Sequence, residues 1–85
     1  MRQFKYVIQD DQGIHARPAG VLVKAANEFQ SSIQMEKRGQ KGDLKRIFGI
    51  MALCIKKGDE VTITIEGTDE DTAAEKMEEL FKQQL

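Results

Sequence analysis

The sequence has very few of the residues that covalent or metal-based sites need. Its 85 residues include one cysteine, one histidine, one proline and no tryptophan. A single cysteine, Cys54, excludes an internal disulfide, and no second cysteine or histidine stands at the spacing of a zinc site. We therefore expect neither a metal nor a cofactor. A chain without disulfides suits the reducing cytoplasm.

A charge excess and long apolar runs are absent as well. Thirteen Lys and Arg residues against 14 Asp and Glu residues give a net charge of -1, which lacks the basic excess of non-specific nucleic-acid binding. The first residues alternate between charged and apolar, unlike a signal peptide, and no later apolar run approaches the length of a membrane span. We expect neither nucleic acid nor a membrane as a partner.

The length allows one domain, residues 1–85, with a modest core. Period-two alternation predicts strands, and three- and four-residue spacing predicts helices. Strands are expected at 4–8, 33–36, 39–42 and 61–66, and helices at 16–29, 44–53 and 69–81. The order β-α-β-β-α-β-α predicts an α+β fold with helices on one face of a single sheet. The pattern leaves the strand order open.

The apolar positions of these elements predict the core, which we expect to hold Phe4, Tyr6, Ile8, Ala19, Leu22, Val23, Ala26, Phe29, Ile33, Met35, Val61, Ile63, Ile65, Ala73, Ala74, Met77, Leu80 and Phe81. In the short helix at 44–53, the helical spacing alone predicts that the core buries Leu44, Ile47, Phe48 and Met51. We expect Asp43 to cap that helix, and Thr68 or Asp69 to cap the last one.

The segment Gly13-Ile14-His15-Ala16-Arg17-Pro18-Ala19 holds the only histidine and the only proline. Proline is tolerated in a first helical turn, so a loop leading into a helix is expected. A neutral His15 ring has a nitrogen that can attack a phosphoryl group. The backbone N–H groups of Ala16 and Arg17 and the Arg17 guanidinium could hold the resulting anion. Local chemistry alone favours the other interpretation, a capping histidine beside a solvated arginine.

This segment resembles the active-site segment of the HPr family, the histidine phosphocarriers of the bacterial phosphotransferase system. Residues 47–51, 57–60 and 69–80 resemble the family's second helix, its following turn and its last helix, so the resemblance covers essentially the whole chain. It implies an HPr-like open-faced β-sandwich, in which a four-stranded antiparallel sheet carries three helices on one side.

The resemblance also implies a function. In that family the histidine matching His15 accepts a phosphoryl group on Nδ1 from phosphorylated enzyme I, ultimately from phosphoenolpyruvate. It passes the group to IIA domains of sugar permeases, and the arginine matching Arg17 assists. The expected protein is a covalent transfer intermediate rather than an enzyme. The positions implied for docking to these partners are Ile47, Phe48, Gly49, Met51, Gly20 and Lys24.

Two alternatives to this function stay open. One is a carrier that acts on transcriptional regulators instead of feeding sugar uptake. The other is an adaptor that binds partners through residues 47–51 and never accepts phosphate. In each case we expect a monomer, because no large apolar surface beyond the docking helix is evident.

Two positions depart from the family pattern. Arg46 stands where many members have a serine that a kinase phosphorylates, so we expect no regulation by serine phosphorylation there. Cys54 stands where the family often has the glycine of a left-handed turn, and we expect a buried or half-buried thiol. The basic residues of this region are expected to form a solvated face that could meet acidic partners: Lys37, Arg38, Lys41, Lys45 and Arg46.

Overall fold

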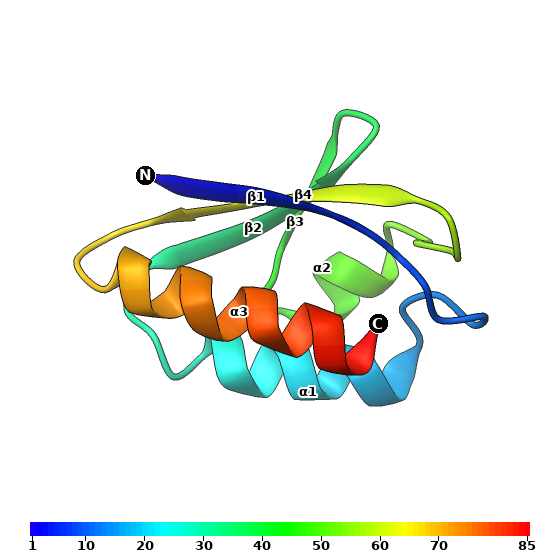
Figure 1. Cartoon of the computed structure of the whole chain (residues 1–85), viewed down its shortest axis with the longest axis horizontal. Helices are drawn as coiled ribbons and strands as arrows, with labels where there is room; N and C mark the ends of the chain where they lie inside the picture. The colour runs from blue at the N-terminus through cyan, green and yellow to red at the C-terminus, as the bar shows by residue number, and fades with distance from the viewer.

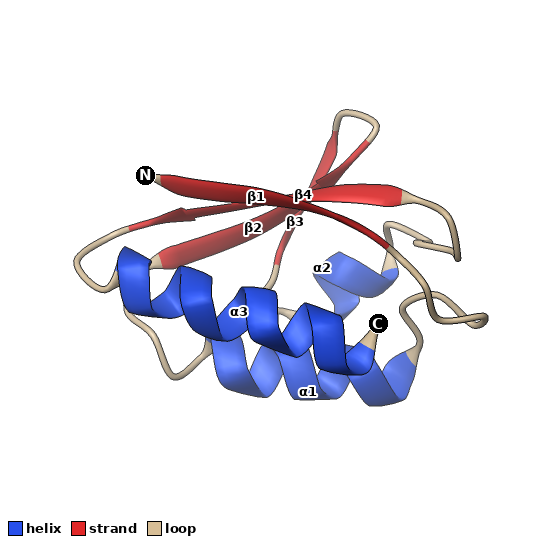
Figure 2. Ribbon diagram, in the orientation of Figure 1, coloured by secondary structure: helices blue, strands red, loops and turns tan.

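A single four-stranded sheet carries three helices on one of its faces, as Figure 1 and Figure 2 show. The computed structural model describes all 85 residues. In chain order its elements are β1 (Arg2–Val7), α1 (Ala16–Ala26), β2 (Ser32–Lys37), β3 (Gln40–Asp43), α2 (Ile47–Met51), β4 (Glu60–Glu66) and α3 (Glu70–Gln84). The strand order is β1-β4-β2-β3, and all neighbours are antiparallel. The predicted α+β fold and open-faced sandwich are confirmed.

The central strand β4 supplies the middle of the core. Ile63 lies opposite Phe4 of β1 and Met35 of β2. Because side chains alternate along a strand, Val61, Ile63 and Ile65 all point to the helical layer, where they are completely buried. Polar residues take the other face of the strand, so the sheet is covered on one side only.

The helices bury the apolar residues that their spacing predicted. Ala73, Ala74, Met77, Leu80 and Phe81 of α3 are all buried, and the predicted core residues of the other elements are buried or packed against the same cluster. None of the helices combines the length and the apolar composition of a membrane-spanning segment.

The helix α1 ends three residues earlier than predicted. Asn27 is its C-cap, and its side-chain amide donates to the carbonyl groups of Val23, at 2.9 Å, and Lys45, at 3.0 Å. These two hydrogen bonds end α1 at Asn27 and attach the helix to the segment before α2. Phe29 still packs against the core from the following turn.

The prediction that Asp43 caps a helix starting at Leu44 is wrong. The Asp43 carboxylate accepts the N–H of Lys45 at 2.9 Å, and the Asp43 carbonyl accepts the N–H of Arg46 at 3.0 Å, which makes a turn. Leu44 remains attached to the sheet, because its N–H donates to the Ile33 carbonyl. The helix α2 therefore begins only at Ile47.

Asp69 connects two loops at the end of the molecule where α3 starts. It is the N-cap residue of α3, as predicted, but its side chain does not cap the helix. The carboxylate instead accepts the backbone N–H groups of Gln30 and Ser31, both at 2.9 Å, and the hydroxyl of the buried Ser31. These hydrogen bonds, led by that of the Ser31 hydroxyl, hold the pKa of Asp69 below its usual range.

We expect the substitution Asp69→Asn to destabilise the protein more at neutral pH than in acid. An amide has one acceptor oxygen where the carboxylate has two, so the N–H of Gln30 loses its partner. A lowered folded-state pKa stabilises the fold above the usual value of 3.8, and this contribution is lost as the pH falls through the folded-state pKa. Urea unfolding at pH 7 and pH 3 should show the difference shrinking in acid. An equal difference at both values would contradict this role.

Candidate functional site

The loop before α1 is fixed by backbone contact with the loop after α2. The N–H of Ile14 donates to the carbonyl of Ile55 at 3.1 Å. Gly13 has a φ of +65°, and a Cβ there would lie 2.2 Å from the same carbonyl oxygen. Only glycine fits this position, because both the conformation and the space exclude a side chain. Sequence reasoning missed Ile55, which carries no polar signal of its own.

His15 is the N-cap residue of α1, at the predicted boundary between loop and helix. Its backbone is extended, with φ -106° and ψ -176°, and its carbonyl accepts the N–H of Ala19 at 3.0 Å. The half-buried ring makes no capping hydrogen bond. Pro18 lies buried in the first turn, where its missing N–H costs nothing.

The start of α1 is suited to an anion. The first-turn N–H groups of Ala16 and Arg17 have no intrahelical acceptor, and no acidic residue lies in this turn. The exposed Arg17 side chain forms no ion pair or hydrogen bond within the chain. The local field is therefore positive, and the structure brings His15, Ala16 and Arg17 together as predicted.

An exposed apolar side chain marks the neighbouring helix α2, which packs against α1 and β3. Phe48 is 85% exposed, whereas Ile50 is fully buried, and Ile47 and Met51 are half-buried. The spacing-based prediction that Phe48 faces the core is wrong, because this five-residue helix turns only its Ile50 side fully inward. The docking position that the resemblance implied for Phe48 agrees with this exposure.

The other implied docking positions lie on the same two helices. Gly20 is half-buried and Lys24 is exposed on α1, and both share a stripe with Arg17 by helical spacing. Gly49 is not the tightest glycine, since an added Cβ would make only ordinary contacts. The backbones of β3 and α2 approach each other closely at Gly42, where an added Cβ would lie 2.7 Å from the Gly49 carbonyl oxygen.

Arg46 is the N-cap residue of α2, but it provides no side-chain cap. The side chain is 81% exposed and its only partner is the Asp43 carboxylate, at 3.8 Å. The free N–H groups of the first turn of α2 therefore lack a side-chain acceptor.

We expect Arg46→Ser to stabilise the protein by about 1 kcal/mol, because a serine hydroxyl can accept an N–H of the first turn. The exposed ion pair that is lost contributes little. Urea unfolding is the measurement, and Arg46→Ala is the matched control, since it removes the same ion pair without adding an acceptor. Equal stabilities of the two variants would rule out the capping effect.

Three residues of the predicted sets are placed differently from expectation. The Cys54 thiol is exposed rather than buried, although its φ of +50° confirms the expected left-handed turn. Two of the five basic residues are not solvated. Lys45 donates to the Phe29 carbonyl at 2.7 Å, and Lys37 donates to carbonyl groups of the loop after α2.

No group of three or more metal-ligating side chains comes together.

Comparison with known proteins gives one consistent result. Residues 2–83 match the family model described as the PTS HPr component phosphorylation site. The histidine-containing phosphocarrier protein of a Mycoplasma has 39% identity and a TM-score of 0.94, over 96% of this chain and 93% of that one. HPr of Bacillus anthracis has 38% identity and a TM-score of 0.86, over 93% and 94%.

A third similar structure is Crh, the catabolite repression protein of Bacillus subtilis, described as a dimer with a swapped domain. It has 38% identity and a TM-score of 0.78, over 100% of this chain and 98% of Crh. The family model and the whole-chain likenesses agree with the fold and with the resemblance of residues 13–19. The chain therefore belongs to the HPr family, the phosphocarrier proteins of the phosphotransferase system.

Proposed function

We propose that His15 accepts a phosphoryl group from phosphorylated enzyme I, which phosphoenolpyruvate charges, and passes it to IIA domains of sugar permeases. The observation that carries the proposal is the place of His15 at the start of α1, with its ring free of capping bonds in a turn without acids. Membership of the HPr family supports the same assignment.

The transfer needs no reactant beyond donor and acceptor. The lone pair of a His15 ring nitrogen forms the new N–P bond while the bond from phosphorus to the donor atom of enzyme I breaks, and that atom keeps the electron pair. The transferred phosphoryl oxygens then lie near the N–H groups of Ala16 and Arg17 and the planar Arg17 guanidinium. Transfer to a IIA domain repeats the exchange with His15 as the donor.

Docking of both partners is assigned to the surface beside this site. Phe48 supplies an exposed aromatic side chain, the kind that dominates binding energy at interfaces. Ile47, Gly49 and Met51 surround it on α2, and Gly20 and Lys24 extend the surface along α1. The chain acts as a monomer in this proposal, although Crh and an HPr of Thermoanaerobacter tengcongensis form dimers.

The proposal excludes regulation by phosphorylation at position 46. Arginine has no hydroxyl, so a kinase that esterifies serine finds no acceptor there, and the Arg46 charge is opposite to that of a phosphoserine. Incubation with an HPr kinase and ATP should leave residues 43–51 unmodified. A stable phosphoester within that segment would contradict this point.

The deciding experiment incubates the protein with phosphoenolpyruvate and enzyme I and measures the intact mass. We expect one acid-labile phosphoryl group on the wild type and its loss on adding a IIA domain. His15→Ala should abolish the adduct, and Arg17→Ala should slow its formation about a hundredfold, since one oxyanion-stabilising donor has roughly that effect. Lys5→Ala, which removes an exposed cation from the face of the sheet that no helix covers, is the matched control.

The same experiment also tests the docking surface, through the enzyme I concentration that gives half-maximal phosphorylation. Phe48→Ala should raise the half-saturating enzyme I concentration about tenfold or more, as expected for a central aromatic contact. Val7→Ala, which removes another exposed apolar side chain on the face of the sheet that no helix covers, should leave it unchanged. An adduct that survives His15→Ala overturns the site, and the absence of an adduct on the wild type overturns the function and favours an adaptor.

A further inference from the structure

Lys37 is an inward-facing lysine at the end of β2. It follows Ile33 and Met35 on the inner side of the strand, because side chains alternate. Only 16% of its side chain is exposed. Its ammonium group donates to the carbonyl groups of Cys54, at 2.9 Å, and Leu53, at 3.3 Å, in the turn that follows α2. The ammonium group thus supplies hydrogen bonds to two backbone carbonyl groups that lie beyond the C-cap of α2.

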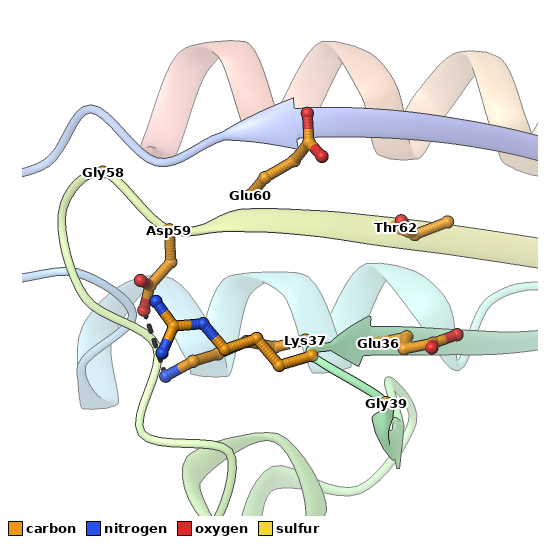
Figure 3. A pocket seen from close by; sticks show the side chains of 8 residues that line it. Glu36, Lys37, Gly39, Gly58, Asp59, Glu60 and Thr62 are labelled. Atoms are coloured by element: carbon orange, nitrogen blue, oxygen red, sulfur yellow. Dashed lines mark ion pairs between the residues drawn. The ribbon is translucent and has the colours of Figure 1, made fainter.

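Asp59 is the acidic partner of Lys37. It immediately precedes β4 and has the inward parity of Val61, so its side chain lies on the same side of the sheet as that of Lys37, with 18% of it exposed. The carboxylate lies 3.1 Å from the Lys37 ammonium and accepts the N–H of Lys56 at 2.8 Å. Figure 3 shows the two side chains meeting. They lie beside a hollow of about 430 Å³.

The residues that line this hollow do not suggest a ligand. Every buried side-chain nitrogen or oxygen of the chain has a hydrogen-bond partner within the chain. The backbone N–H of Lys56 and then the Lys37 ammonium hold the pKa of Asp59 below its usual range, so the Asp59 carboxylate is ionised at neutral pH. The pair is therefore a structural link between β2 and residues 53–59.

The linked segment is the one that touches the loop before His15. Ile55 lies inside it, one residue after the left-handed Cys54, and its carbonyl accepts the N–H of Ile14. Gly13 packs directly on the backbone of Ile55 and Lys56. In Figure 1 the loop between α2 and β4 and the loop between β1 and α1 lie at the same end of the molecule.

We propose that Lys37 is a positioning residue for the phosphorylation site, because its ammonium and the Asp59 carboxylate fix the 53–59 segment whose Ile55 carbonyl holds Ile14 and thereby the backbone of His15. This inference rests on the proposed function of His15. Lys37 touches no reacting atom. Its effect is on geometry, and displacement of a reacting group by about 1 Å costs on the order of a hundredfold in rate.

The test replaces Lys37 by methionine, which keeps an apolar stem and removes the ammonium, and by arginine as the conservative variant. Two matched controls are available. Lys41→Met removes a positive charge from β3 at an exposed residue. Asp69→Asn breaks a polar connection at the opposite end of the molecule (Figure 1), and so reproduces a loss of stability without touching residues 53–59.

The first readout is amide hydrogen exchange, which needs no phosphoryl transfer. Lys37→Met should speed exchange of the Ile14 N–H at least tenfold more than exchange of the β4 amides, and Lys37→Arg should restore most of the protection. In Asp69→Asn the Ile14 and β4 amides should change together. Equal acceleration of the Ile14 and β4 amides in Lys37→Met would mean that Lys37 is only a general stabilising residue, and would overturn the proposal.

The second readout is phosphorylation by enzyme I. Lys37→Met should lower the rate at saturating enzyme I about tenfold and leave the half-saturating concentration unchanged, because the Phe48 surface is intact. A change in the half-saturating concentration alone would overturn the positioning role. If the wild type forms no adduct, the proposed function of His15 fails, and the exchange data still show whether Lys37 fixes Ile14.

Discussion

Gly13→Ala is expected to destabilise the protein by about 3 kcal/mol and to displace His15. A left-handed φ costs a residue with a Cβ about 1–2 kcal/mol. The new methyl group would also collide with the Ile55 carbonyl oxygen, 2.2 Å away, and with the Cα of Lys56 at 2.7 Å. Both obstacles are backbone atoms, so the loop itself must move, and overpacking of this kind costs about 1–3 kcal/mol.

The matched control for this substitution is Gly39→Ala in the β2–β3 hairpin. Gly39 is also left-handed, with a φ of +85°, but nothing lies within 4 Å of an added Cβ. Urea unfolding should show that Gly39→Ala lowers the free energy of unfolding by about 1–2 kcal/mol. The additional loss in Gly13→Ala then measures the cost of the steric clash with residues 55–56. The rate of phosphorylation by enzyme I should fall only for Gly13→Ala. Equal losses of stability in Gly13→Ala and Gly39→Ala would show that the backbone of residues 55–56 moves away from the new methyl group at little cost.

Phe81→Ala is the second large effect, with an expected loss of about 3–5 kcal/mol. Phe81 is fully buried in α3, and its ring meets Phe4 and Tyr6 edge-on, at centroid distances of 5.7 and 5.8 Å. The truncation leaves a cavity between α3 and β1 and removes both aromatic contacts. A domain of this size is stable by only about 5–15 kcal/mol, so the variant should lose a large part of its stability.

Phe81→Leu separates the two contributions. Leucine keeps most of the volume but not the edge-on contacts, each worth about 0.5–1.5 kcal/mol, so its cost should lie well below that of alanine. Equilibrium urea unfolding measures both variants. A cost under about 1.5 kcal/mol for Phe81→Ala would mean that α3 and β1 close over the gap.

The sequence predicts those elements best whose periodicity is long and unambiguous. Val61, Ile63 and Ile65 alternate strictly with polar residues, and α3 repeats its apolar stripe over four turns, so both elements begin within one residue of the predicted start. The helix α3 continues beyond its predicted end, to Gln84. The short helix was predicted too long, because the pattern of 44–53 does not reveal that Asp43 forms a turn. A five-residue helix has too few positions for spacing to separate a buried side from an exposed one, which explains the error at Phe48.

The site was predictable only where it is contiguous in sequence. His15, Ala16 and Arg17 lie within one turn, so the start of α1 could be inferred from the proline and the expected boundary. Ile55 acts through a backbone contact between segments that are distant in the sequence, and nothing in its apolar side chain signals such a contact. Lys37 did carry a signal, since the parity of Ile33 and Met35 puts it on the inner side of β2, but its charge suggested a solvated position.

The central place of β4 has a consequence for the order in which the protein folds. The first strand, β1, pairs only with β4, so Arg2 meets Ile65 across most of the chain. Pairings between such distant residues carry a large loop-closure cost and form slowly. During synthesis β1 has no partner strand until residues 60–66 have left the ribosome. The loop before His15, which joins β1 to α1, therefore reaches its final form only after β4 has been made.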